Sequence, residues 1–362
     1  MSNVSPKEIV PQFKVPAKIA GIHRFDRGII NDTYIVTCIE EGEDKRFILQ
    51  RINGEVFEKP DEVMSNIRVV TEHLRKGAEA KDRVLKLVRT HNNENSLIDS
   101  NDSVWRMYNF IENSTTFDTL LSVNMAYQVG TAFGAFQGEL AGIEATSLHK
   151  TIDGFHNTSK RLTRFKEVLA EDPRGRAKKC KNEIEYILEN QHIAPVLMDL
   201  ERTQELPTRI THNDTKVNNV LFDQDTHQAL CVIDLDTIMP GISLFDYGDL
   251  VRSATCPSAE DERDLSKVYM QMDYYKALTR GWIEACKGEI TEKELELMPF
   301  SARLIAYELA MRFLRDYLNG DQYFKTSRPD QNLDRARTQI KMAQSFEENE
   351  AEMKQYIASI TA

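Results

Sequence analysis

Three polar side chains in one short run of the sequence have the types and the spacing that phosphoryl transfer requires. The run THNDTKVNNVLF, residues 211–222, places His212, Asp214 and Asn219 in the pattern H-x-D-x-x-x-x-N. A carboxylate at the second position can accept the proton of a substrate hydroxyl, and an amide at the last position can bind a metal ion. We therefore predict a catalytic loop that His212 orients, in which Asp214 acts as the base.

A second carboxylate is expected to reach this loop through a hairpin. Asp234 follows the apolar run 229–233, which predicts a buried strand. The stretch VLFDQDTHQALCVI contains two apolar runs joined by a polar turn, so it predicts a hairpin that returns Asp234 to Asp214 and Asn219. Phosphoryl transfer uses this grouping, because one carboxylate faces the nucleophile while an amide and a second carboxylate bind Mg²⁺. The spacing is also that of a protein-kinase catalytic loop.

Simpler explanations account less well for the whole group. Asp and Asn favour turns for local hydrogen-bonding reasons, which explains any single Asp here but not the full set. A calcium-binding loop running from Asp223 and Asp225 to Asp234 fails, because Gln228 occupies the position that requires Gly. The sequence also lacks the pattern G-x-x-x-x-G-K-[ST], which argues against a P-loop kinase.

Composition limits the classes of partner. The 362 residues are 41% hydrophobic and 28% charged, as in ordinary globular proteins, with a formal net charge of −11 and a pI of about 5.4. An acidic surface repels nucleic acid and anionic membranes, so we expect neither as a partner. The first residues contain no apolar core of signal-peptide length, so we expect no signal peptide. No apolar run reaches membrane-spanning length, and the five cysteines form no C-x-x-C pair. These features predict a cytoplasmic protein with reduced thiols.

The predicted elements divide the chain into two lobes. Strand patterns over residues 21–51 and 96–112 flank a helix that begins at Pro60 and ends at Gly77. From residue 113 the periodicity is helical. The predicted helices cover residues 125–142, 158–170, 181–200, 262–286, 292–318 and 333–360. We therefore predict an α+β, bilobal, protein-kinase-like fold, with a strand-rich small lobe (residues 1–112) and a mainly helical large lobe (residues 113–362).

The small lobe is expected to contact the nucleotide phosphates. In DRGIINDTY, a turn between two strands, Gly28 lets the backbone approach phosphates, and Asn31 or Thr33 can donate hydrogen bonds to them. The next strand should carry a phosphate-binding lysine, but it offers Gln50 and Arg51 instead. Phosphate charge must then be met by magnesium or by a basic residue from elsewhere.

Two further groups of polar residues lie beyond the catalytic loop. In SLFDYGDLVRS, Asp246 is expected to cap a helix that begins near Gly248 and to hold down the catalytic loop. Farther on, the run MRFLRDYLNGDQYF places three residues suited to sugar recognition around a helix end: Arg312, Asp321 and Tyr323. A helix ending at Asn319-Gly320 explains part of that pattern.

A resemblance to a known family rests on motifs that run through most of the chain, namely THNDTKVNN, IDLDTIMPG, FDYGD, MRFLRDYLNGDQYF, RTQIK, RFILQ and WRMYNFIE. These motifs resemble those of the N-acetylhexosamine 1-kinases, within the aminoglycoside phosphotransferase and choline kinase superfamily. The resemblance implies transfer of the ATP γ-phosphate to the anomeric hydroxyl of N-acetylglucosamine or N-acetylgalactosamine. It also implies Asp214 as the base and Asn219 and Asp234 as Mg²⁺ ligands, and this branch carries Gln at the position of Gln50.

We accordingly expect ATP and Mg²⁺ in a cleft between the lobes, with adenine held by the connector at Phe110 and Ile111, and a sugar bound by Asp214, Arg312, Asp321 and Tyr323. Two alternatives stay open. One is a kinase of the same fold that acts on an aminoglycoside, choline or homoserine. The other is a non-catalytic nucleotide-binding module, which the Gln at position 50 favours and the intact catalytic set disfavours. The sequence gives no indication of oligomeric state.

Overall fold

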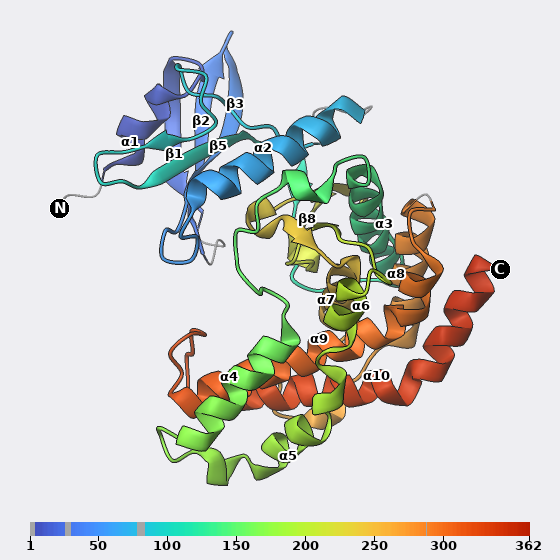
Figure 1. The fold of residues 1–362 in the computed structure, drawn as a ribbon. Helices are drawn as coiled ribbons and strands as arrows, with labels where there is room; N and C mark the ends of the chain where they lie inside the picture. The colour runs from blue at the N-terminus through green and yellow to red at the C-terminus, as the bar shows by residue number, and fades with distance from the viewer. Residues whose placement is uncertain (1–3, 26–29, 78–83, 287) are drawn as a thin grey trace.

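The computed structural model of the chain describes residues 4–25, 30–77, 84–286 and 288–362. An antiparallel sheet near the N-terminus, in blue and teal, is followed by a mainly helical part in green to red (Figure 1). This arrangement of a strand-rich part followed by a helical part is the one predicted. The predicted division between residues 112 and 113 falls in the connector after the sheet and stays a prediction. None of the helices in the described ranges is long and apolar enough to cross a membrane.

The N-terminal sheet has five strands in the order β1-β2-β3-β5-β4. Their bounds are β1 Lys18–Arg24, β2 Asp32–Glu40, β3 Glu43–Arg51, β4 Leu97–Ile98 and β5 Val104–Asn109. Strands β2 and β3 are joined through Glu41 (φ 54°) and Gly42 (φ 93°), the left-handed pair that a tight hairpin turn requires. One face of the sheet is covered by the short helix α1 (Pro6–Ile9) and by Phe13, which the sequence analysis did not predict.

Helix α2 (Pro60–Gly77) has the predicted apolar face, but that face packs into the core of the helical part. The amide of Asn66 fixes the contact, because Nδ2 donates to the carbonyl of Ile238 at 2.9 Å and to that of His149 at 2.8 Å. Helix α2 therefore joins the sheet to the segment that carries Asp234 and Asp236.

Two small sheets carry the candidate site. The three-stranded sheet contains β6 (Ser114–Thr115), β8 (Val220–Asp223) and β9 (Ala229–Val232). Strands β8 and β9 pair antiparallel, which confirms the predicted hairpin. The second sheet pairs β7 (Arg209–Thr211) with β10 (Met239–Gly241).

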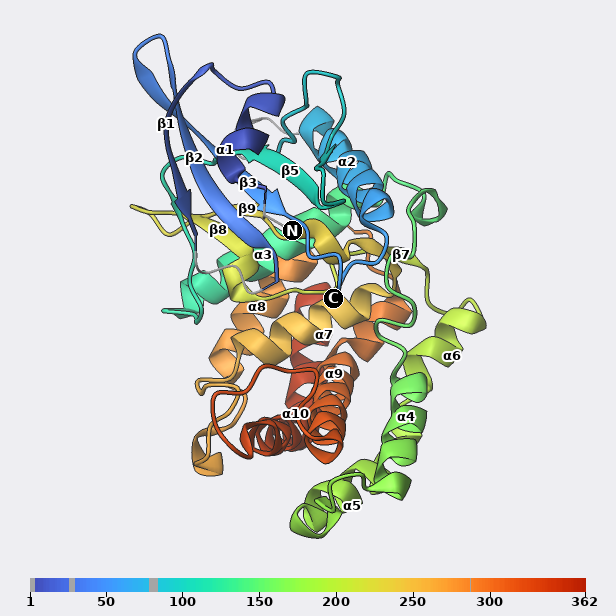
Figure 2. The same ribbon diagram turned by 90° about the vertical axis from the view of Figure 1, so that its left-hand side faces the viewer.

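The remaining elements are helices that pack around one extended core, with α9 and α10 side by side (Figure 2). Their bounds are α3 Val123–Leu140, α4 Thr158–Glu171, α5 Lys181–Glu189, α6 Val196–Arg202, α7 Ser243–Ala254, α8 Met272–Ala285, α9 Glu292–Asn319 and α10 Gln331–Thr361. Helices α3 and α8 approach closely because α3 presents Gly130, Gly134 and Gly138 to the backbone of α8. A side chain at any of these three positions would meet the backbone of α8 or of Cys286 directly after it.

Two helix predictions were too long. The helix predicted over residues 181–200 is divided into α5 and α6, because a 3₁₀ turn at Gln191–Ile193 is followed by Pro195. The helix predicted over residues 262–286 begins only at Met272.

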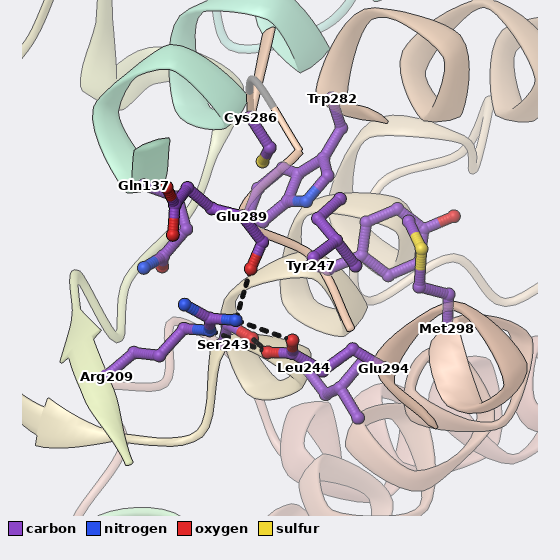
Figure 3. Close-up of a pocket in the computed structure, with 11 residues that line it drawn as sticks. Gln137, Arg209, Ser243, Leu244, Tyr247, Trp282, Cys286, Glu289, Glu294 and Met298 are labelled. Atoms are coloured by element: carbon purple, nitrogen blue, oxygen red, sulfur yellow. Dashed lines mark hydrogen bonds and ion pairs between the residues drawn. The ribbon is translucent and has the colours of Figure 1, made fainter. Parts of the chain in front are cut away.

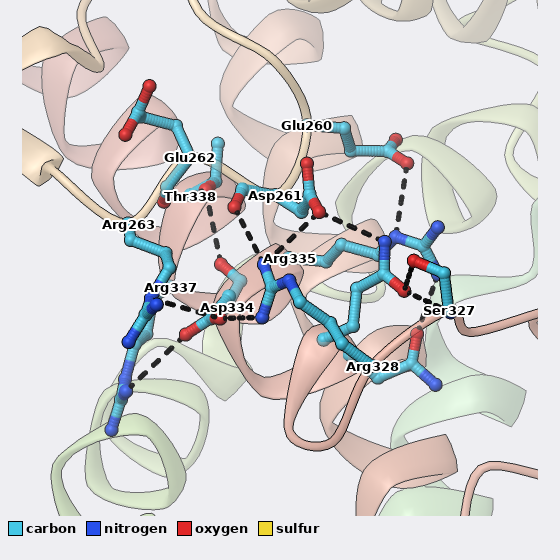
Figure 4. A network of polar contacts seen from close by, with 12 residues as sticks. Glu260, Asp261, Glu262, Arg263, Ser327, Arg328, Asp334, Arg335, Arg337 and Thr338 are labelled. Atoms are coloured by element: carbon cyan, nitrogen blue, oxygen red, sulfur yellow. Dashed lines mark hydrogen bonds and ion pairs between the residues drawn. The ribbon is translucent and has the colours of Figure 1, made fainter.

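The segment before Met272 contains only a short 3₁₀ turn (Leu265–Lys267), because long-range contacts hold it. Arg328, which precedes α10, binds the carboxylate of Asp261 at 3.1 Å (Figure 4). Gln331, the first residue of α10, binds the same carboxylate at 2.9 Å. Val268 and Met270 then point into the core two residues apart, the period of an extended chain.

Candidate active site

One buried carboxylate fixes the start of the catalytic loop. The backbone N–H groups of His212 and Asn213 donate to the two oxygens of Asp246, each at 2.7 Å. The main-chain carbonyl of Asp246 accepts the hydroxyl of Thr215 at 2.6 Å. The predicted tie between Asp246 and the loop is confirmed. The predicted helix start near Gly248 is wrong, because α7 already begins at Ser243, which puts Asp246 inside the first turn.

His212 is buried among aromatic rings and bonds to main-chain groups. Its ring packs edge-on against Phe133 and Phe136 of α3, at centroid distances of 5.5 and 5.8 Å. Nε2 lies 2.9 Å from the carbonyl of Ile233, and the N–H of Asp214 donates to Nδ1 at 3.2 Å, so the proton belongs on Nε2. Burial lowers the pKa of His212, although the Ile233 carbonyl acts in the opposite direction. This geometry suits a residue that orients the loop.

Asp214 is held in its charged form by two neighbours. Lys216 Nζ lies 2.5 Å from Oδ1, and Asn219 Nδ2 donates to Oδ2 at 3.0 Å and to the Asp214 carbonyl at 2.8 Å. Desolvation alone raises the pKa of Asp214, but the ammonium of Lys216 and the amide of Asn219 outweigh it, so the pKa lies below its usual value. The side chain keeps 29% of its surface accessible. A small substrate can therefore reach an ionised carboxylate.

Asp234 and Asp236 follow β9, as the hairpin predicts. Asp234 has the left-handed conformation (φ 63°) and is accessible to solvent, although protein atoms crowd around it. This crowding, together with the carboxylates of Asp236 and Asp214, raises the pKa of Asp234 above its usual range. Asp236, in contrast, is buried and forms an ion pair with Arg106 of β5. The two carboxylates thus have different environments two residues apart.

The predicted phosphate-contacting residues of the small lobe converge on this ion pair. Oε1 of Gln50 accepts hydrogen bonds from Nε and Nη2 of Arg106, at 3.0 and 2.8 Å. Nε2 of Gln50 donates to the hydroxyl of Thr33 at 3.1 Å. Asn31 Nδ2 donates to Oδ2 of Asp236 at 2.5 Å. The structure therefore brings Asn31, Thr33 and Gln50 together, while Gly28 lies outside the described residues.

The connector residues expected at the adenine lie directly after β5. The N–H of Phe110 donates to the carbonyl of Arg46 at 3.2 Å, and the Arg46 guanidinium covers the Phe110 ring at 4.1 Å. Ile111 is buried, and its carbonyl accepts the hydroxyl of Ser114 at 2.5 Å. Both residues belong to the short chain segment that links the sheet to the helical part.

The three residues expected at the sugar separate into two groups. Arg312 packs over the ring of Phe324 at 5.5 Å, and Tyr323 is 66% exposed. Both influence the pKa of Arg161 in α4, which Arg312 lowers and Tyr323 raises. The carboxylate of Asp321 instead binds Arg176 at 2.6 Å and Asn332 at 3.0 Å.

Arginines gather around Arg312. Arg161 forms an ion pair with Glu308 at 3.2 Å, and Glu308 also binds Nδ1 of His156 at 3.3 Å. Burial, together with Arg312 and Arg315, lowers the pKa of Arg161 to about 10, although Glu308 acts in the opposite direction. His156 stacks on Phe245 at 4.8 Å, next to Asp246. The arginine group is therefore linked to the catalytic loop through intermediate side chains.

Asn219 and Asp234 fit a Mg²⁺ ion. The amide nitrogen of Asn219 is engaged by Asp214, which leaves the amide oxygen as its metal-binding atom. Asp234 forms no ion pair with any described residue. No group of three or more His, Cys, Asp or Glu side chains in the described ranges is arranged to hold a metal. Mg²⁺ typically uses one or two carboxylates together with substrate phosphates and water, so this small ligand set suits Mg²⁺ that arrives with a nucleotide.

The sequence analysis missed two cations at the site. The position of Lys216 could have been predicted, because it lies two residues after Asp214 and an extended loop places such residues on the same side. The position of Arg106 could not have been predicted from spacing, because it depends on the register in which β3 and β5 pair.

A separate small cavity lies between α3, α7, α8 and α9. Figure 3 shows Arg209 of β7 bound there to Glu294, at 2.7 and 2.8 Å, and to the main-chain carbonyl of Glu289. Glu294 also accepts the hydroxyl of Ser243 at 2.6 Å. These contacts anchor β7 to α7 and α9. Because β7 directly precedes the catalytic loop, they also hold the start of that loop in place.

Comparison with known proteins defines the class of this chain. A profile of the phosphotransferase enzyme family (APH) matches residues 21–274, which include both the sheet and the catalytic loop. The chain therefore belongs to this family, as a small-molecule phosphotransferase.

Solved structures with a similar fold include an aminoglycoside phosphotransferase from Alicyclobacillus acidocaldarius, with a TM-score of 0.60, 13% identity and coverage of 100% of this chain and 96% of that one. A choline kinase from Cryptosporidium parvum has a TM-score of 0.59, 13% identity and coverage of 98% and 100%. Spectinomycin phosphotransferase, solved with ADP and spectinomycin, has a TM-score of 0.59, 12% identity and coverage of 96% and 99%. These similarities confirm the predicted kinase-like fold.

Replacing Asp246 tests the anchoring of the loop. In Asp246→Ala the N–H groups of His212 and Asn213 lose their acceptors inside the protein, and each unsatisfied buried group costs about 1–3 kcal/mol. We expect the free energy of unfolding, measured by urea denaturation, to fall by that order. Asp246→Asn keeps one acceptor oxygen, so its free energy of unfolding should fall by less. Equal stability of Asp246→Ala and the unmodified protein contradicts this role.

Proposed function

We propose that this phosphotransferase transfers the γ-phosphate of ATP to the anomeric hydroxyl of an N-acetylhexosamine, N-acetylglucosamine or N-acetylgalactosamine. The observation that carries the proposal is the state of Asp214, an accessible carboxylate kept ionised by Lys216 and Asn219. Asp214 lies close enough to Asp234 to raise its pKa, and Asp234 forms no ion pair with any described residue, so it can bind a metal. A base next to a metal–phosphate site is the arrangement that phosphoryl transfer to a hydroxyl needs.

ATP is proposed to lie between the sheet and the helical part. Its adenine contacts the connector at Phe110 and Ile111, and its phosphates approach Asn31, Thr33 and Asp234. That spectinomycin phosphotransferase, which has a similar fold, was solved with ADP supports the binding of a nucleotide by this fold. Asn219 and Asp234 hold Mg²⁺, which offsets the negative charge of the phosphates when it is bound.

Asp214 orients the acceptor hydroxyl and takes its proton as the oxygen attacks the γ-phosphorus. The bond from that phosphorus to the bridging oxygen breaks, and ADP leaves. His212 contributes indirectly, because its Nδ1 accepts the backbone N–H of Asp214 and so fixes the direction of that residue. The anomeric hydroxyl is the most acidic hydroxyl of a free sugar, so a carboxylate assists its deprotonation more readily than that of a primary alcohol.

The arginine group supports a neutral acceptor over a cationic one. Aminoglycosides and choline carry positive charge and need carboxylates at their site. Here burial, and after it the charge of neighbouring arginines, lowers the pKa values of Arg161 and Arg315, and Arg312 contributes to both shifts. We assign Arg312 and Tyr323 to the sugar. We assign Asp321 the role of holding the loop that carries Tyr323, through Arg176 and Asn332.

Replacing the base tests the chemical step. Asp214→Asn keeps the shape of the side chain but cannot accept a proton, and loss of a general base typically costs about 10²- to 10⁴-fold in rate. We expect kcat to fall within that range while the affinity for ATP changes little. Steady-state assays of ADP release, with calorimetric titration of ATP, measure both quantities. Turnover close to that of the unmodified protein refutes the assignment.

Identifying the product tests the substrate and the position of transfer. We expect ADP release with N-acetylglucosamine or N-acetylgalactosamine and much less with glucose, choline or an aminoglycoside. In the NMR spectrum of the product, the phosphorus should couple to the anomeric proton. Coupling to the C6 methylene protons indicates a 6-kinase and overturns the proposal, as does a clear preference for a cationic acceptor.

A further inference from the structure

The strand that normally supplies a phosphate-binding lysine carries Gln50, and the structure indicates which cation replaces it. We infer that Arg106, on the neighbouring strand β5, binds the phosphates of the nucleotide. This inference rests on the proposed function, because it requires a nucleotide in the cleft.

The register of the sheet places Arg106 beside position 50, on the face to which a lysine at that position of β3 would point. Gln50 is directly opposite Arg106 on one side and directly opposite Thr33 on the other. Side chains directly opposite one another in adjacent strands point to the same face of a sheet. Thr33, Gln50 and Arg106 therefore form a row across three strands, on the face that meets Asp236.

The contacts of Gln50 explain why this position is not a lysine. Its amide oxygen accepts both Nε–H and Nη2–H of Arg106, which holds the guanidinium in one orientation. A lysine ammonium has no acceptor atom, and at position 50 it faces a second positive charge at hydrogen-bonding distance. In the row formed by Thr33, Gln50 and Arg106, the cation is thus carried by β5 and the orienting amide by β3.

Burial of Arg106 argues for a function beyond packing. Arg106 is only 1% exposed, and a buried guanidinium is costly unless an anion compensates its charge. Here Nη1 pairs with Asp236, and Asp234 lies near enough to affect the same group. A phosphate held by a metal on Asp234 therefore comes next to Arg106. Because a guanidinium forms a planar fork that matches phosphate oxygens, it can bind phosphate there.

Asp236 then acts as the partner of Arg106 in the protein without nucleotide. It is bound from the other side by Asn31 Nδ2 at 2.5 Å, a residue from the turn expected to cover the phosphates. Nucleotide binding replaces part of this contact, since phosphate oxygens and the Asp236 carboxylate compete for the same guanidinium. The cation is thus kept in place and neutralised before ATP arrives.

Calorimetric titration with Mg-ATP and with adenosine, without sugar, tests this inference. Removing Arg106 should weaken binding of the phosphates and leave adenosine binding unchanged. For Arg106→Gln we expect the affinity for ATP to fall about 10- to 100-fold, the effect of losing one charge-assisted contact. Arg51→Gln is the matched control, because Arg51 is the next residue on β3, points to the other face and pairs with Asp32. The Arg51→Gln variant should bind both Mg-ATP and adenosine with the affinity of the unmodified protein.

Two double variants separate phosphate binding from a purely structural role. Arg106→Gln with Asp236→Asn removes both charges and leaves no buried charge unpaired, so folding is preserved; its affinity for ATP should stay low. Arg106→Gln with Gln50→Lys returns a cation to β3 and should recover part of that affinity. Thermal unfolding verifies that each variant is folded.

The outcomes distinguish the inference from the proposed function. If the folded double variant Arg106→Gln with Asp236→Asn has the same ratio of ATP affinity to adenosine affinity as the unmodified protein, Arg106 is a structural residue and the inference is wrong. If the unmodified protein binds ATP but phosphorylates no sugar, the proposed function fails while the titrations still decide the role of Arg106. If the unmodified protein binds neither ligand, both fail.

Discussion

The structure depends on the way in which three neighbouring carboxylates are compensated. Asp214, Asp234 and Asp236 lie close enough to raise one another's energy when they are ionised. Lys216 compensates Asp214, and Arg106 compensates Asp236. Asp234 forms no such pair in the described part of the chain, so the charge that remains uncompensated is the one placed to bind a cation. The repulsion among these carboxylates costs free energy. A metal ion that binds at Asp234 relieves this repulsion, which favours the binding of the metal together with its phosphates.

The surrounding elements hold these charges at fixed positions. Asp246 fixes the backbone of the catalytic loop, His212 ties that loop to the carbonyl of Ile233, and the β8–β9 hairpin returns the chain to Asp234. Both Asn213 and Asp234 adopt left-handed backbone conformations, with φ of 65° and 63°. Such conformations cost energy for residues other than Gly, and they persist where surrounding contacts enforce them, often at functional sites.

Local patterns predicted the parts of this site that are local in sequence. The spacing of His212, Asp214 and Asn219 is contained in one loop, and the hairpin leading to Asp234 is visible as two apolar runs. Arg106 was not predictable in this way, because its proximity to Gln50 depends on the register of strands more than fifty residues apart in sequence. The absence of an α-helix before Met272 was missed for the same reason, since Asp261 is held by Arg328 and Gln331, about seventy residues farther along the chain. Asp321 was grouped with Arg312 by proximity in sequence, although its carboxylate binds Arg176 and Asn332.

A crystal structure of the protein with Mg²⁺, a non-hydrolysable ATP analogue and N-acetylglucosamine tests the central claim most directly. The account predicts the anomeric oxygen within hydrogen-bonding distance of the Asp214 carboxylate, at about 2.6–3.2 Å. It also predicts a metal ion bonded to the side-chain oxygens of Asn219 and Asp234. A different sugar hydroxyl at Asp214, or a metal held by Asp236 in place of Asp234, contradicts it.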